Sequence, residues 1–327
     1  MMLNEIREFL AEDLSGTENL IKSSLNSDID LLNKTNDAIF SHGGKKMRPL
    51  MALLVARMCS GGKTTKDTIR FAAASELLHN ATLLHDDVAD NSDERRGVPT
   101  VMSVLGGQAS VLLGDYWLVK AVENILAADD NSEEVIRIFA KTLSDLAEGE
   151  MLQLQKASSG DTDEDDYFRI IYSKTASLFE AAGVSAAISV RAPEWMIEAS
   201  REYSVNLGIA FQIKDDILDY CGDAKMGKPL GVDLEEQKIT LPLLGALKSV
   251  DEKDAVDVRN KVVNISDHPE LKDEVREFVF KHQGESFASA KLDEYVGKAV
   301  KALEVFPDSK EKDYLAKIAT FTARRNK

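Results

Sequence analysis

Apolar residues recur at every third or fourth position along nearly the whole chain, and the stretches that separate these runs are short and polar. This period is typical of helices that bury one face. It predicts helices at about 2–14, 17–41, 49–60, 69–90, 108–128, 132–157, 166–190, 193–221, 235–250, 252–264, 269–283, 285–304 and 309–323. No stretch of convincing length alternates between apolar and polar residues as a half-buried strand does. The pattern therefore predicts an all-α fold.

The predicted helices follow one another without a break in composition. We find no linker rich in proline, glycine or serine, and 44% of the 327 residues are hydrophobic, which is enough for a sizeable core. We therefore expect a single domain over residues 1–327. Pro242 stands inside the helix expected at 235–250, where it could break that helix.

Two clusters of aspartates stand at the C-terminal ends of two predicted helices. Both have the spacing i, i+1, i+4, and their members are Asp86, Asp87 and Asp90, and Asp215, Asp216 and Asp219. Acids at this end of a helix add to its partial negative charge and cost up to about 1 kcal/mol each. The first and third acids of each cluster share a helical face, where they repel each other unless a cation binds between them. Oxygen ligands of this kind suit Mg²⁺.

An alternative interpretation is that these acids are solvated surface residues, since the chain has 56 acidic and 40 basic residues. The spacing is repeated, however, and each cluster follows an apolar lead-in, ATLL in one case and FQI in the other. Those features favour a functional site with two acidic halves.

Basic residues accompany the acids in the sequence. Arg95 and Arg96 directly follow the first cluster, and the glycine-containing stretch GGKKMRP at 43–49 carries Lys45 and Arg48 at the start of a helix. Guanidinium groups match phosphate oxygens, and helix starts offer free N–H groups, so this pattern indicates an anion site beside a metal site. For Lys46, in the same stretch, a solvated surface lysine is the alternative interpretation.

The motifs DDVAD, DERRG and DDILD resemble the two aspartate-rich motifs of the trans-polyprenyl diphosphate synthases. The resemblance covers nearly the whole chain, from GGKKMRP to KITLPLL at 238–244, in the family's order. It implies a helical bundle of the isoprenoid synthase type with a central cavity, a homodimer, and Mg²⁺ bound by the six aspartates, with three ions in the substrate-bound state.

The resemblance also implies roles for individual residues. Those that match the isopentenyl diphosphate site are Lys45, Arg48, His79 and Arg96. Those that match positions serving the allylic diphosphate and its departure are Arg95, Lys174, Thr175, Gln212, Lys228 and Lys238, among which Lys174, Thr175, Gln212 and Lys228 are expected to be catalytic. Lys174 and Thr175 lie in an otherwise apolar helix, where a cation and a hydroxyl both need partners.

The chemistry implied is ionisation of the allylic diphosphate, attack by the double bond of isopentenyl diphosphate, and loss of a proton. In this family the residues four and five before the first aspartate help set the floor of the product tunnel, and here they are Thr82 and Ala81, with Leu78 beyond them. None is aromatic. We therefore expect a long all-trans product of about six to ten isoprene units in an apolar tunnel.

Composition limits the other partners and the compartment. The net charge of −16 argues against a nucleic-acid partner, which needs a basic face. Two cysteines without metal-binding spacing indicate neither a disulfide framework nor zinc, and neither a signal peptide nor a membrane span is evident, so we expect a cytoplasmic protein. Its product could be passed to a membrane enzyme.

Four alternatives remain open from the sequence. A synthase of shorter, farnesyl or geranylgeranyl diphosphate products would share all the motifs. A terpene cyclase shares the ionisation step but has no use for a second diphosphate site. A non-catalytic subunit of a heteromeric synthase characteristically loses motif aspartates, and here both sets are present. A metal-dependent phosphohydrolase would need a water-activating histidine near a cluster.

Overall fold

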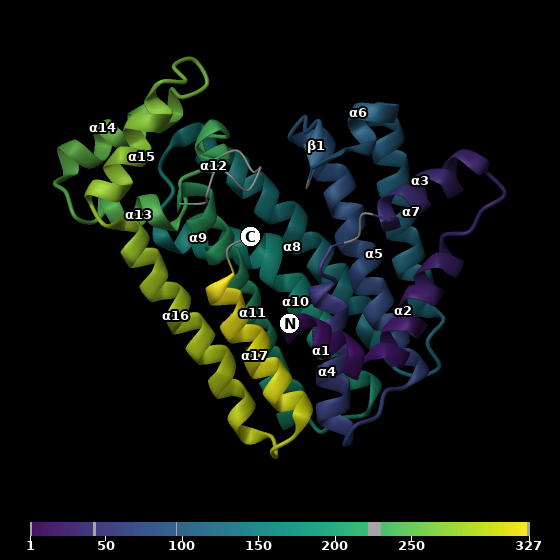
Figure 1. Ribbon diagram of the computed structural model, residues 1–327. Coiled ribbons are helices and arrows are strands. Elements are labelled where there is room, and N and C mark those ends of the chain that lie inside the picture. Colours follow the sequence, from purple (N-terminus) through teal and green to yellow (C-terminus); the bar gives the residue numbers. More distant parts are fainter. Residues whose placement is uncertain (1, 42–43, 96, 222–229, 326–327) are drawn as a thin grey trace. The chain divides into compact units, whose positions relative to one another are not determined.

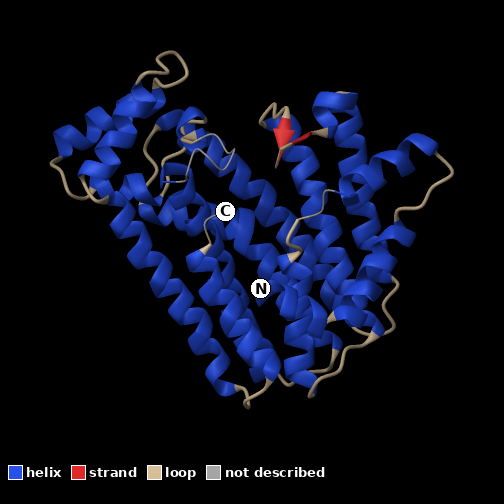
Figure 2. Cartoon of the chain, in the orientation of Figure 1, coloured by secondary structure: helices blue, strands red, loops and turns tan. Residues whose placement is uncertain are grey.

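The computed structural model describes residues 2–41, 44–95, 97–221 and 230–325 (Figure 1). The described chain is mainly helical (Figure 2), which confirms the predicted all-α class. The α-helices are α1 Met2–Phe9, α2 Ala11–Ser24, α3 Asp30–Ser41, α4 Met47–Ser60, α5 Lys66–Ala89, α6 Val101–Leu105, α7 Gly107–Leu126, α8 Ser132–Ser159, α9 Glu164–Ile171, α10 Ser177–Ser189, α11 Glu194–Cys221, α12 Val232–Glu235, α13 Leu241–Leu247, α14 Glu252–Val263, α15 Leu271–Lys281, α16 Gly284–Ala302 and α17 Lys310–Arg324. No helix of the described residues is long and apolar enough to cross a membrane.

The chain divides into two compact units, which are described separately below. The first comprises Met1–Ala140, Glu180–Arg201 and Val305–Leu315, and the second comprises Lys141–Phe179, Glu202–Glu304 and Ala316–Lys327. Helices α8, α10, α11 and α17 contribute residues to both units. The first aspartate cluster belongs to the first unit and the second cluster to the second, and the prediction of a single domain stays a prediction.

Several predicted boundaries are wrong. The single helix expected over 17–41 is interrupted between α2 and α3, because the amide of Asn33 accepts from the N–H of Ser27 at 3.0 Å and donates to its carbonyl at 2.7 Å. These bonds offer the backbone an alternative to the helix. The expected helix 166–190 contains a π-helical segment, Tyr172–Ala176. The loop at 91–99 contains a short antiparallel pair, β1 Glu94–Arg95 and β2 Val98–Pro99.

The break suspected at Pro242 is confirmed. The short helix α12 ends at Glu235, where one helix was expected to start, and a second helix, α13, begins only at Leu241, with the proline in its first turn. Proline is tolerated there because the first N–H groups of a helix have no intrahelical acceptor.

In the first unit, α5 packs against α2, α4 and α7. Gly114 of α7 permits a close approach to α5, because a Cβ at this position would lie 2.4 Å from Nε2 of His85. Trp117 of α7 is 1% exposed and donates from Nε1 to Asn36 of α3 at 2.8 Å. Burying a large apolar side chain stabilises the fold by roughly 1.5–3 kcal/mol.

In the second unit, α13 packs against α15 and α16. Every residue of α13 is buried, and Gly284 lets α16 begin against it, since a Cβ at Gly284 would lie 2.0 Å from the carbonyl oxygen of Pro242. The same core includes Tyr220 at the end of α11 and Tyr167 on α9. This core therefore fixes the end of the helix that carries the second aspartate cluster.

Candidate active site

The first aspartate cluster lies at the C-terminal end of α5. The helix starts at a capping box, in which Thr65 accepts from the N–H of Thr68 and the Thr68 hydroxyl accepts from the N–H of Thr65. This cap and the buried apolar face of the helix hold it over the six turns that lead to the acids. Asp86 and Asp87 lie in the last turn of this helix, which ends at Ala89 with Asp90 as its C-cap.

The three side chains of this cluster have different surroundings. Asp87 is 5% exposed, and its Oδ1 accepts from Nε of Arg95 at 2.7 Å. Asp86 is half-buried and Asp90 is exposed, and they occupy the same helical face. Arg95 therefore supplies the positive charge that the acidic helix end requires, while Asp86 and Asp90 are accessible for a cation.

The other basic residues predicted near this cluster lie on elements of the same unit. Arg48 is in the first turn of α4 and is 9% exposed, and Lys45 lies two residues before Met47, where that helix begins. His79 is half-buried on α5, two turns before Asp86. Arg96 lies outside the described residues.

The second cluster, near the end of α11, surrounds a buried carboxylate. Asp216 is 3% exposed; its Oδ2 accepts from the hydroxyl of Tyr167 at 2.5 Å, and its Oδ1 accepts from Nε2 of Gln212 at 2.8 Å. Gln212 in turn accepts from the hydroxyl of Thr175 at 2.7 Å. Burial raises the pKa of Asp216 to about 7, although its two hydrogen bonds act in the opposite direction.

The two outer acids of this cluster also have partners. Asp215, whose side chain is one-third exposed, lies 3.0 Å from Nη1 of the buried Arg325. Asp219 accepts from the N–H groups of Val232 and Asp233 at 3.1 and 3.2 Å. These N–H groups belong to the first turn of α12, so the carboxylate of Asp219 favourably caps that helix.

The π-helical segment presents Lys174 and Thr175. Lys174 forms an ion pair with Glu150 and donates to Oε1 of Gln153 at 3.1 Å, so its charge has partners within the protein. Such segments are frequent at functional sites. Glycines let two helices approach it: a Cβ at Gly149 of α8 would lie 2.5 Å from Cβ of Ser173, and one at Gly208 of α11 would lie 2.6 Å from Cα of Ala176.

The remaining predicted residues are Lys238, Lys228 and the three residues of α5 expected at the floor of the product tunnel. Lys238 forms an ion pair with Glu236, and Lys228 lies outside the described residues. Leu78 and Ala81 are each 1% exposed on α5, and the hydroxyl of Thr82 donates to the carbonyl of His79 at 2.9 Å. The proposed floor of the tunnel is therefore a densely packed part of α5.

The described residues contain no group of three or more acidic, histidine or cysteine side chains placed to hold a metal ion together. In each cluster the middle acid, Asp87 or Asp216, is buried and hydrogen-bonded, whereas the two outer acids are at least partly exposed. Pairs of hard carboxylate oxygens fit a divalent cation that takes its remaining ligands from water and from a phosphorylated substrate, which is the usual coordination of Mg²⁺.

Three residues of the second unit were missed from the sequence. Tyr167 resembles a core residue, although its place two turns before Lys174 on the same run of helix could have indicated it. Glu150 gave no signal, and the basic stretch TARRNK that contains Arg325 matched too weakly to assign it a role. Each of the two contacts a predicted site residue that is distant in sequence. The guanidinium of Arg325 also lies 3.9 Å from the ring centroid of Phe211 and donates to its carbonyl.

Comparisons with known proteins extend over the whole chain. Residues 29–279 match the family model described as Polyprenyl synthetase. The chain is 38% identical to an octaprenyl diphosphate synthase of Haemophilus influenzae over 327 residues, which are 100% of this chain and 98% of that protein.

Two crystal structures resemble the whole chain with a TM-score of 0.91 and 33% identity. One is a polyprenyl synthase from Caulobacter crescentus complexed with calcium and isoprenyl diphosphate, with 99% of this chain and 98% of that one covered. The other is a decaprenyl diphosphate synthase from Rhodobacter capsulatus, with 99% of each chain covered.

Proposed function

Because this chain belongs to the polyprenyl synthetase family and is therefore a trans-prenyltransferase, we propose that it elongates an allylic diphosphate with isopentenyl diphosphate to a long all-trans polyprenyl diphosphate. The observation that carries the proposal is the presence of both complete aspartate clusters, each at the end of a helix, in a chain similar over its full length to an octaprenyl diphosphate synthase. An intact pair of clusters argues against a non-catalytic subunit.

Mg²⁺ is the cofactor that the site fits. The residues that would hold it are the partly exposed outer acids of the two clusters, Asp86, Asp90, Asp215 and Asp219. Three ions in the substrate-bound state are part of the proposal. When bound, the metal supplies Lewis-acid neutralisation of the diphosphate, which makes it a better leaving group. Asp87 and Asp216 are better suited to hold neighbouring side chains in place, since both are buried and hydrogen-bonded.

The protein's own residues orient the substrates and stabilise the departing charge. Lys174 and Arg95 are the cations assigned to the allylic diphosphate, and in the second unit the hydrogen bond from Thr175 orients Gln212. Breaking the allylic C–O bond leaves an electron pair on the diphosphate and a carbocation on the chain. Cationic donors lower this barrier most when they are already oriented before the reaction.

Isopentenyl diphosphate is assigned to the basic residues of the first unit, Lys45, Arg48 and His79, together with Arg96. Its double bond attacks the carbocation to form the new C–C bond. Loss of one proton to the released diphosphate then gives the trans double bond, so the step requires no protein nucleophile. Held together in the site, the two substrates react without the entropic cost of a bimolecular encounter.

The long product follows from the residues of α5 above the first cluster. Ala81 is small and Thr82 and Leu78 are not aromatic, so no bulky ring of this helix turn stops the growing chain. This feature separates the proposal from the synthesis of farnesyl or geranylgeranyl diphosphate. The similarity to octaprenyl and decaprenyl diphosphate synthases supports the same choice.

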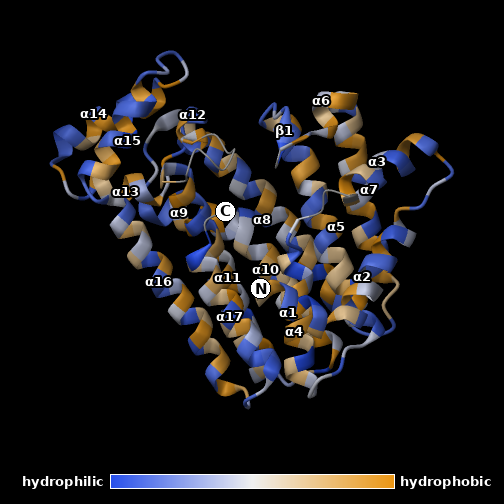
Figure 3. Ribbon diagram, viewed as in Figure 1, coloured by the Kyte–Doolittle hydropathy of each residue, from blue (hydrophilic) through white to orange (hydrophobic). Residues whose placement is uncertain are grey.

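A homodimer is part of the proposal. Helices α6 and α7 contain hydrophobic stretches, which are orange in Figure 3. The large apolar residues that these helices expose are Val104, Leu105, Val111, Leu112, Val119 and Leu126. Exposed apolar patches of this kind commonly mark protein interfaces.

A cytoplasmic location is also proposed, since Cys59 and Cys221 are both free thiols. The apolar product suits transfer to a membrane enzyme.

The test is product formation by the purified full chain expressed alone, with and without each substrate. We expect diphosphate release only when Mg²⁺, the allylic primer and isopentenyl diphosphate are all present. Asp86→Ala should lower kcat about a hundredfold or more, whereas Asp293→Ala, an exposed aspartate of α16, should leave it unchanged. Release of diphosphate from the primer alone would indicate a cyclase or a phosphohydrolase, and inactivity of the chain alone would indicate a partner subunit.

A further inference from the structure

The segment that leads into α4 has an unusual backbone conformation. Lys46, the residue before the helix, has φ 52° and ψ 45°, which is the left-handed region. A residue with a Cβ is disfavoured there, and such conformations persist only where the surrounding structure imposes them. Lys46 lies between Lys45 and Arg48, the residues assigned above to isopentenyl diphosphate, so its conformation affects where both of them lie.

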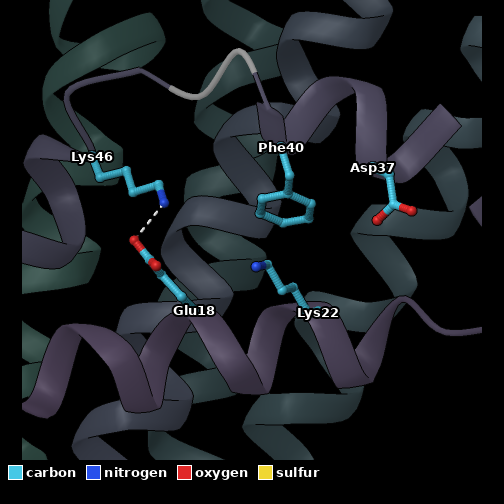
Figure 4. A pocket seen from close by; sticks show the side chains of 5 residues that line it. All are labelled: Glu18, Lys22, Asp37, Phe40 and Lys46. Carbon is cyan, nitrogen blue, oxygen red and sulfur yellow. Dashed lines mark hydrogen bonds and ion pairs between the residues drawn. The ribbon is translucent and has the colours of Figure 1, made fainter. Parts of the chain in front are cut away.

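Two contacts from the N-terminal helices impose this conformation. Nζ of Lys46 lies 2.6 Å from Oε1 of Glu18 on α2, an ion pair shown in Figure 4. Nη2 of Arg7 on α1 donates to the carbonyl oxygen of Lys45 at 3.1 Å. One contact holds the side chain of Lys46 and the other holds the peptide that precedes it, so the two together restrict both ends of the strained residue.

The ion pair between Lys46 and Glu18 lies beside a cavity. Lys46 and Glu18 line a cavity of about 260 Å³ together with Lys22, Asp37 and Phe40 (Figure 4). The side chain of Lys46 is 21% exposed and that of Glu18 is 43% exposed, so the pair is only partly screened by solvent. Lys46 therefore has an ion-pair partner in the protein among the residues that line this cavity.

We propose that Glu18 and Arg7 are positioning residues for isopentenyl diphosphate, because they hold the segment from Lys45 to Arg48 in its binding conformation. This inference rests on the proposed function of Lys45 and Arg48. Without Glu18, the left-handed conformation of Lys46 loses the contact that favours it. The backbone then relaxes toward ordinary dihedral angles, and Lys45 moves relative to α4.

The effect is expected in one kinetic parameter. Glu18→Ala should raise the KM for isopentenyl diphosphate about threefold to tenfold, as expected for loss of one partly exposed ion pair that opposes backbone strain. The kcat and the KM for the allylic diphosphate should change by less than about twofold. Loss of an interaction that only positions one substrate weakens its binding in the ground state and in the transition state equally, so it raises that KM without lowering kcat. Arg7→Ala should have the same signature, and Glu12→Ala, an exposed glutamate on α2, is the matched control.

A double-mutant cycle with Lys46→Gly makes the assignment specific. Glycine removes the ion pair and also adopts positive φ at little cost, so Glu18→Ala should have no further effect on the KM for isopentenyl diphosphate in this background. An unchanged KM in Glu18→Ala and in Arg7→Ala, or equal effects on both substrates, would overturn the inference. A wild-type enzyme that does not require isopentenyl diphosphate would instead overturn the proposed function.

Discussion

Gly208 of α11 lies directly against the π-helical segment that carries Lys174 and Thr175. A Cβ added at Gly208 would lie 2.6 Å from Cα and 2.9 Å from Cβ of Ala176. Ordinary contacts between carbon atoms are about 3.5–4.0 Å, so Gly208→Ala requires one of the two backbones to move by roughly 1 Å. The hydroxyl of Thr175 and the amide of Gln212, which now form a bond of 2.7 Å, lie next to the point of overlap.

The expected cost follows from two opposing effects. Overpacking of a buried site costs about 1–3 kcal/mol, and this case belongs at the upper end because the overlap is with the main chain. Alanine gains up to about 1 kcal/mol over glycine in a helix interior, which leaves a net loss of roughly 2 kcal/mol. With an unfolding entropy of about 2.1 cal/mol/K per residue, that loss lowers the Tm by about 3 °C in a chain of 327 residues.

The assay is thermal unfolding of Gly208→Ala beside a matched control. Gly297 of α16 has no atom within 4 Å of its added Cβ, so Gly297→Ala should raise the Tm by about 1 °C through helix propensity alone. The kcat of Gly208→Ala should fall as well, and that of Gly297→Ala should not. If Gly208→Ala matches Gly297→Ala in Tm and kcat, the close approach of α11 to the π-helical segment does not position the site.

Three further predictions concern other parts of the molecule. Tyr167→Phe removes one hydrogen bond from the buried Asp216 and should lower kcat about tenfold while the protein stays folded. Steady-state kinetics and thermal melting together test this, and an unchanged kcat would make Tyr167 a core residue only. Ala81→Phe should shorten the product seen by chromatography, and an unchanged product would remove Ala81 from the tunnel floor. Leu112→Glu, at a side chain 62% exposed, should convert a dimer to a monomer in analytical ultracentrifugation, and a persistent dimer would exclude this face as the interface.

The sequence was most informative where a repeated spacing had one physical cause. The helical period predicted most elements because each helix buries a face, and the aspartate spacing indicated the acidic sites because two such clusters at helix ends are electrostatically unfavourable without a cation. The interruption before α3 was missed because it depends on the side-chain amide of Asn33. The π-helical segment was missed because it spans little more than one turn, which is too short to change the apolar period of the helices on either side.

The contacts that hold the site residues could not be read from the sequence. Tyr167 and Asp216, and Asp215 and Arg325, are brought together by tertiary packing, and neither pair has a local pattern. The different burial of the acids within each cluster likewise results from tertiary packing. Spacing placed the first and third aspartates of each cluster on one helical face, and the structure adds that the middle acid, Asp87 or Asp216, is buried and hydrogen-bonded.

The most direct test of the account is chromatography of the dephosphorylated product made by the purified chain from isopentenyl diphosphate and farnesyl diphosphate in the presence of Mg²⁺. The account predicts a single all-trans polyprenol of about six to ten isoprene units, because none of Leu78, Ala81 and Thr82 of α5 is aromatic. A product that ends at geranylgeraniol, or farnesol recovered without elongation, would contradict it.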